Sequence, residues 1–179
     1  RRSVANIGDR NGDGEDDFAI GCPGANAEAG IVYFYDGMTG ALVETDPGDP
    51  ASRLGHSLGG GHDVDGDGIP DAVAGAPGIG ATSGCFRVYE GAGLTAVEDV
   101  SRGGGSDRFG WSIDMLGDAD GDGLADVIVG DTEATQGRGA VFVYSSSESG
   151  MVQSFHQAGN RPQKVMGRAV AGLGDRNGD

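Results

Sequence analysis

The sequence predicts an all-β fold of repeated four-stranded units, a fragment of a β-propeller, and three observations support it. A unit of about 55 residues recurs along the chain. Its apolar segments are short, rich in Val, Ile, Phe and Tyr, and bounded by Gly, Asp or Asn, which is typical of strands. The 37 glycines among 179 residues leave hardly any window long enough for a helix, so we expect no regular helix.

An acidic loop of nine residues marks each unit. It begins at Asp9, Asp63 and Asp118, and a fourth copy that begins at Asp175 is cut off. A spacing of about 55 residues is typical of propeller blades. We therefore expect blades at 1–50, 51–105 and 106–163, with the start of a fourth at 164–179. The chain would then be a piece of a larger propeller, and its first blade would lack the first residue of the repeat.

Each unit contains four expected strands in a fixed order. In the third unit these lie at 111–116, 126–130, 140–144 and 151–155, with the acidic loop between the first two. The outer strands of the first two units are expected near 41–45 and 94–100. Four short antiparallel strands per repeat are what a propeller blade requires.

The charge balance excludes two classes of partner. Lys and Arg number 12 against 28 Asp and Glu, which gives a formal net charge of -16. A chain of this sign is repelled by a nucleic-acid backbone and by an anionic membrane surface. No apolar stretch approaches the roughly 20 residues that a membrane helix needs, so we expect no membrane insertion in this segment.

The spacing within the acidic loops favours a cation held by oxygen atoms. In a tight turn, side chains at positions one, three, five and nine and the carbonyl at position seven converge on one point. Glycines at positions four and six permit this turn. Such a ligand set suits calcium better than magnesium, and zinc has no suitable ligands here. The sequence therefore predicts about three complete calcium sites and a truncated fourth.

The candidate ligands are side chains, except at position seven, where the backbone carbonyl would bind. They are Asp9, Asn11, Asp13, Glu15 and Asp17 in the first loop, Asp63, Asp65, Asp67, Ile69 and Asp71 in the second, Asp118, Asp120, Asp122, Leu124 and Asp126 in the third, and Asp175, Asn177 and Asp179 in the truncated fourth.

Two other interpretations explain these loops less well. Plain Asp-Gly turns explain one loop but not three in register, and carboxylates packed so closely would repel one another without a cation. An EF-hand needs a bidentate Glu at position twelve and flanking helices. The residues at that position are Ile20, Ala74 and Val129, inside strand-like runs, so the EF-hand fails on both counts.

The order of landmarks in each unit resembles the FG-GAP repeat of integrin α-chain propellers and of many secreted bacterial proteins. Leu54-Gly55, Phe109-Gly110 and Met166-Gly167 precede the loops, and Ala76-Pro77 follows one of them. The resemblance covers the whole chain, and it implies a propeller, usually of seven blades, with calcium in the first hairpin of several blades. Leu54, Met166 and Cys22 depart from the pattern, as does Gly130-Asp131-Thr132 where Gly-Ala-Pro would stand.

Three further features have both a structural and a functional interpretation. Cys22 and Cys85 could form a disulfide, but they occupy different positions of neighbouring blades. The three histidines, His56, His62 and His156, lack the partners of a catalytic triad, so structural or surface roles are favoured. Trp111 could stack on a sugar, although packing is the favoured interpretation.

The resemblance implies a non-catalytic, calcium-binding propeller module for extracellular or cell-surface binding and adhesion. Its partner would be a protein or carbohydrate ligand at the propeller face. The alternative is an accessory propeller of a secreted hydrolase or lyase whose catalytic domain lies outside this segment. A structural role in a surface layer is a third hypothesis. No recognition motif in the rim loops, such as 25–29 and 132–138, identifies the ligand.

Overall fold

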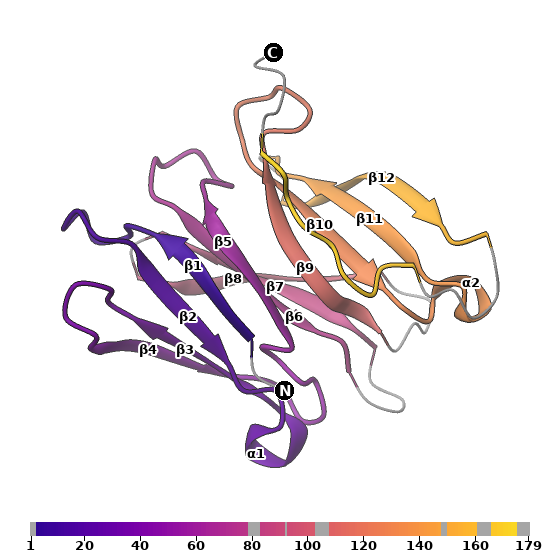
Figure 1. Cartoon of the computed structure of the whole chain (residues 1–179), viewed down its shortest axis with the longest axis horizontal. Coiled ribbons are helices and arrows are strands. Elements are labelled where there is room, and N and C mark those ends of the chain that lie inside the picture. Colours follow the sequence, from indigo (N-terminus) through magenta and orange to yellow (C-terminus); the bar gives the residue numbers. More distant parts are fainter. Residues whose placement is uncertain are drawn as a thin grey trace.

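The computed structural model describes residues 3–78, 83–91, 93–102, 108–147, 150–160 and 166–174. It is all-β, with three four-stranded antiparallel sheets that lie side by side in chain order (Figure 1). Within each sheet, sequential strands are neighbours. This arrangement confirms the predicted fragment of a β-propeller. The sheets span 3–47, 57–101 and 109–158, while the exact blade boundaries stay predictions.

The strands occur where the apolar runs predict them. The first sheet consists of β1 (Ser3–Gly8), β2 (Asp17–Gly21), β3 (Ile31–Tyr35) and β4 (Leu42–Pro47). The second consists of β5 (Ser57–His62), β6 (Asp71–Ala76), β7 (Cys85–Glu90) and β8 (Thr95–Ser101). The third consists of β9 (Phe109–Gly117), β10 (Asp126–Asp131), β11 (Ala140–Ser145) and β12 (Val152–Ala158).

Two short helical turns depart from the expectation of no helix. They are α1 (Ala25–Glu28) and α2 (Ala134–Gly137), and each lies between the second and third strands of its blade. Both are irregular, because Asn26 and Thr135 have positive φ angles of 48° and 52°. A turn of four residues shows no helical periodicity, which is why the apolar pattern does not reveal it.

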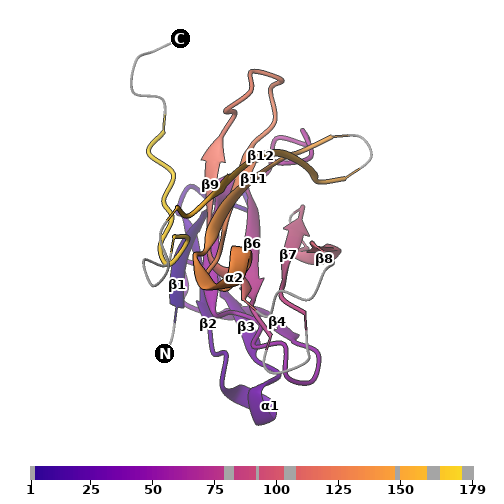
Figure 2. The same ribbon diagram turned by 90° about the vertical axis from the view of Figure 1, so that its right-hand side faces the viewer.

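The first strands of the blades form the inner layer of the fragment. Strand β1 packs beside β5, and β5 packs beside β9. In a four-stranded meander, the loop after each first strand lies at the opposite end from the loop after the second. The acidic loops therefore gather at one end of the blades, and α1 and α2 lie at the other. In Figure 2, α1 is at the bottom and the loop that joins β9 and β10 is at the top.

Glycine residues allow neighbouring blades to approach closely. A Cβ on Gly75, in β6, would collide with the carbonyl oxygen of Gly110 at the start of β9. The hydroxyl of Ser57 donates a hydrogen bond of 3.0 Å to that same carbonyl. The contact recurs in the other blades, where Ser3 donates to Gly55 and Ser112 to Gly167. The glycines in the recurring landmarks are thus required by packing between blades.

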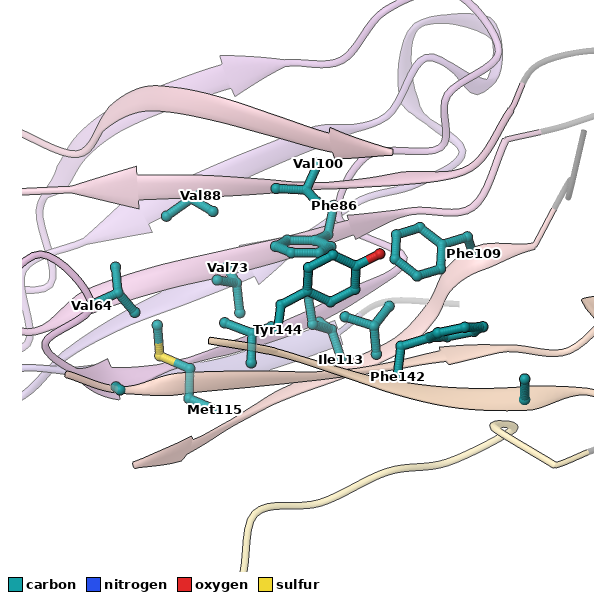
Figure 3. Packing of buried hydrophobic residues seen from close by; sticks show 14 of the residues in the cluster. Val64, Val73, Phe86, Val88, Val100, Phe109, Ile113, Met115, Phe142 and Tyr144 are labelled. Carbon is teal, nitrogen blue, oxygen red and sulfur yellow. The ribbon is translucent and has the colours of Figure 1, made fainter. Parts of the chain in front are cut away.

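Aromatic side chains fill the space between the second and third blades (Figure 3). Phe109 is fully buried, and its ring centroid lies 5.7 Å from that of Phe142 and 6.0 Å from that of Phe86. Leu54 holds the equivalent position one blade earlier and is 1% exposed. The residue before the landmark glycine is therefore an anchor between blades, and an aliphatic side chain fulfils the same role. No helix in the described residues is long and apolar enough to cross a membrane.

Candidate metal centres

Each acidic loop joins the first two strands of its blade and is shaped by its own first aspartate. The two carboxylate oxygens of Asp63 accept hydrogen bonds from the amides of Gly66 and Gly68, at 2.7 and 2.8 Å. Both glycines have φ of 84°, a conformation that other residues rarely adopt. Asp9 and Asp118 bind the corresponding glycine amides of their loops. The three loops therefore share one backbone conformation.

The side-chain oxygens at positions three and five also accept hydrogen bonds from amides of their own loop. Asp65 accepts a hydrogen bond of 3.0 Å from the amide of Asp67, and Asp67 accepts one of 2.7 Å from the amide of Ile69. The other loops repeat these bonds, through Asn11 and Asp13 in the first loop and through Asp120 and Asp122 in the third. The amide of each position-seven residue thus lies beside the position-five carboxylate.

Two loops bring three carboxylates into one small volume. In the second loop, oxygens of Asp63, Asp65 and Asp71 all lie within 4.8 Å of one another. In the third loop, oxygens of Asp118, Asp120 and Asp122 do the same. Most of these side chains face solvent, although Asp71 is buried. Such clusters repel strongly unless a cation lies between them.

The aspartate at position nine is buried at the start of the second strand. Asp17, Asp71 and Asp126 are 6%, 0% and 1% exposed. One oxygen of each accepts a hydrogen bond from the amide at position two of the loop. The second oxygen of Asp17 and of Asp71 accepts an amide bond from the turn after the third strand. Position nine therefore fastens the loop to the blade, a role that the ligand spacing alone does not reveal.

Burial makes these carboxylates costly to ionise without a cation. It raises the pKa of Asp71 to about 6, against the lowering effect of the amide bonds from Val64 and Gly91. It also raises the pKa of Asp126, and the buried Oδ1 atom of that residue has no hydrogen-bond partner among the described residues. A metal ion nearby would favour the charged form of both groups.

The described residues thus fit a cation bound through oxygen atoms. All donors are carboxylate, amide or backbone oxygens, which suit hard ions such as calcium. Asp67 and Asp126 belong to the same loops but lie outside the two tight carboxylate clusters. In the first loop, Asn11 replaces one carboxylate, and its amide nitrogen donates to Asp36 at 3.0 Å. Three predicted ligands, Asp175, Asn177 and Asp179, lie outside the described residues.

The pattern of ligand positions missed a contact between neighbouring loops. Arg10, at position two of the first loop, is 3% exposed, and its guanidinium donates to the carbonyls of Pro70 and Gly91 in the next blade. The amide of Ala125, in the third loop, donates to the carbonyl of Asp63 in the second at 2.8 Å. The sequence signal for such a link is an arginine at position two of an acidic loop, and the direction in which its side chain reaches depends on how the blades pack.

The geometry agrees with the comparisons with known proteins. The FG-GAP repeat family matches residues 54–92, which include the whole second acidic loop. Integrin alpha-5 of Xenopus laevis is 38% identical over 91 residues, 45% of this chain. Integrin alpha-V of Gallus gallus is 31% identical over 167 residues, 83% of this chain. The chain is an FG-GAP repeat protein of integrin-α-like type. It spans only 9% and 15% of the lengths of these two relatives.

Comparison with solved structures supports the β-propeller fold. Rhamnogalacturonan lyase YesW and a rhamnogalacturonan lyase of Bacillus licheniformis superimpose with TM-scores of 0.57 and 0.58. Each match covers 91% of this chain and 35% of the lyase, at 12% and 13% sequence identity. At such identities the likeness concerns the fold alone.

The structure also places the other residues singled out in the FG-GAP chain. Cys22 and Cys85 are free thiols, so no disulfide joins them. His56 lies against Trp111, with ring centroids 4.4 Å apart and its Nδ1 atom 2.9 Å from the Trp111 carbonyl oxygen. His156 stacks on Phe142 at 4.8 Å. Trp111 is half-buried, so it combines packing with some exposure.

Proposed function

We propose that this FG-GAP propeller module binds calcium in its acidic loops and serves extracellular binding or adhesion without catalysis of its own. The observation that carries the proposal is the convergence of three carboxylates within 4.8 Å in each of two loops with the same hydrogen-bond pattern. Seven or so oxygen ligands at flexible distances are typical of calcium, whereas magnesium demands a tight octahedron and keeps its waters.

The ions would act by replacing repulsion with coordination. Each would fix the hairpin between the first and second strands of its blade, because the ligands lie on both sides of the turn. Three divalent ions would also offset part of the formal charge of -16. A rigid blade loses less conformational entropy when a partner binds at its face, so calcium would support binding indirectly.

A surface location outside the cell supports calcium binding. Extracellular calcium is abundant enough to occupy sites of the 10⁻⁴ to 10⁻³ M class, roughly the affinity of extracellular modules. The likeness to integrin α-chains favours the same location. The end of the blades that carries α1 and α2 is opposite the acidic loops and remains available for a protein or carbohydrate ligand.

An accessory propeller of a secreted lyase is the second candidate function. The fold likeness to two rhamnogalacturonan lyases favours it. In that case a catalytic domain would lie outside this segment, and the propeller would support or present substrate. A lyase assay on the whole protein, alongside a cell-surface binding assay, separates this candidate from adhesion.

Calorimetric titration with calcium tests the principal proposal. We expect about three sites, and a rise in Tm with calcium that magnesium does not reproduce. The melts are compared in calcium, in magnesium and in chelator at equal ionic strength, so that general screening by salt is controlled. Absence of binding heat, or an equal effect of magnesium, would mean that the loops are only turns.

A further inference from the structure

A hollow lies at the end of the molecule opposite the acidic loops, where strand β9 begins. Its volume is about 440 Å³, and its walls include Arg108, Trp111, Thr132, Glu133 and Arg168. These residues come from the start of β9, from the rim loop that contains α2 and from the first turn of the next unit. We name this space the Arg168 hollow.

A second hollow also includes Trp111 in its lining. Its volume is about 360 Å³, and we name it the Arg53 hollow. It is lined by Pro23, Gly24, Glu28, Arg53, His56 and Trp111. Trp111 therefore lines both spaces. Both volumes fall within the range of about 300 to 1,000 Å³ that is usual for small-molecule sites.

The two hollows have similar linings because the repeat places residues from equivalent positions of successive units around each of them. His56, Trp111 and Arg168 each follow the landmark glycine of their unit, at Gly55, Gly110 and Gly167. Arg53 and Arg108 each precede the buried landmark residue by one position. Consecutive blades thus present a row of aromatic and cationic side chains at this end.

Each hollow contains an arginine paired with a glutamate. The Arg53 Nε atom lies 2.7 Å from a carboxylate oxygen of Glu28, and the Arg108 Nε atom lies 3.0 Å from one of Glu133. The Arg108 guanidinium also lies 5.0 Å from the centre of the Trp111 ring. Arg168 is exposed and forms no ion pair with the described residues. Three of the 12 basic residues of a strongly acidic chain therefore gather around one tryptophan.

We propose that the two hollows together bind a saccharide that contains uronic acids. Sugar hydroxyls both donate and accept, so they can use both members of an arginine–glutamate pair. A uronate carboxylate would accept a bidentate hydrogen bond from Arg168, which forms no ion pair with the part of the chain that the structure describes. The side chains of an acidic peptide fit less well, because ionised carboxylates only accept hydrogen bonds and so could use the arginines but not Glu28 and Glu133. This inference rests on the proposed function and names the ligand class of the module.

Trp111 gives a local measurement, because it is the only tryptophan in the chain. Its fluorescence is titrated with trigalacturonate, with the neutral galactotriose as matched control and with triglutamate as the peptide alternative, in calcium. We expect trigalacturonate to cause a saturable change in Trp111 fluorescence and galactotriose to bind at least about tenfold more weakly. Binding of trigalacturonate should weaken as the ionic strength rises. Equal affinity for galactotriose, or tighter binding of triglutamate, would overturn the proposal.

Two matched variants locate the carboxylate contact. Arg168→Gln should weaken trigalacturonate binding about tenfold and leave galactotriose binding unchanged, because the charge-assisted bond is lost. Arg138→Gln removes the same charge from an exposed site outside both hollows and should change neither. Parent-like affinity of Arg168→Gln for trigalacturonate would contradict the assignment. Thermal melts in calcium verify that both variants are folded.

Calcium titration of the same samples separates this inference from the proposed function. Calcium binding with no response to trigalacturonate would overturn the saccharide site alone. A fluorescence response without calcium binding would overturn the calcium proposal and leave the saccharide site standing.

Discussion

The guanidinium of Arg10 donates a hydrogen bond to the backbone carbonyl of Pro70, and so ties the first acidic loop to the second. Arg10 is almost completely buried, and it lies near the carboxylates of Asp17, Asp67 and Asp71. One positive charge therefore partly neutralises two loops at once. Each loop is stabilised by its neighbour as well as by its own hairpin.

Replacing Arg10 by Met tests this link. Arg10→Met should lower the free energy of unfolding in chelator by about 1–3 kcal/mol, because it removes the guanidinium bonds to the carbonyls of Pro70 and Gly91 and a cation near Asp71. The rise in Tm caused by calcium should be larger than in the parent, since the ion no longer competes with the guanidinium charge. Urea unfolding with and without calcium measures both effects, and the exposed Arg138→Met is the control.

Removal of one candidate ligand should abolish one calcium site. Asp122→Ala should lower the stability in calcium by about 2.7 kcal/mol when free calcium is 100-fold above Kd. For a chain of this size, that corresponds to roughly 5 to 10 °C in Tm. Asp67→Ala should behave alike in the second loop. Little change is expected in chelator, and calorimetry should show one site fewer.

Glu15→Ala is the matched control for the ligand variants. It removes an acidic side chain from the first loop but keeps the backbone carbonyl that is the candidate ligand at that position. We expect its calcium stoichiometry to equal that of the parent. If Asp122→Ala and Asp67→Ala both melt like the parent in calcium, the coordination proposal is wrong.

The close approach of the blades predicts the effect of adding a single methyl group. Gly75→Ala should destabilise the chain by about 1–3 kcal/mol, because its Cβ would collide with the Gly110 carbonyl and the Ser57 hydroxyl. The loss should be the same in calcium and in chelator, since no ligand changes. Gly24→Ala is the control, because nothing lies within 4 Å of its added Cβ and its φ is -91°. Equal stability of the two variants would contradict the packing described here.

The two cysteines should remain thiols under oxidising conditions. Burial raises the pKa of Cys85 to about 11, so its reactive thiolate is scarce at neutral pH. The rate of alkylation of Cys85 should therefore increase as the pH rises towards 11, at a higher pH than for an unperturbed thiol. Mass spectrometry of non-reduced peptides measures disulfide formation and the extent of alkylation, with Cys22→Ser and Cys85→Ser as controls. A linked Cys22–Cys85 peptide would contradict the structure.

Local sequence determined the strands and the acidic turns. The outer strand expected at 94–100 is found at Thr95–Ser101, and the inner one expected at 111–116 is found within Phe109–Gly117. These features depend on alternation of apolar residues, on β-branched and aromatic side chains, and on glycine in tight turns, all of which act over a few residues. Calcium binding itself stays a prediction.

The packing of the blades decided what local patterns could not. The contact of His56 with Trp111, the reach of Arg10 to Pro70 and the burial of Gly75 against Gly110 each join residues of different repeats. Such contacts depend on the twist and spacing of neighbouring sheets, to which no short stretch of sequence is sensitive. The repeat therefore determines which side chains occupy equivalent positions of the blades, while the tertiary structure decides which of them are in contact.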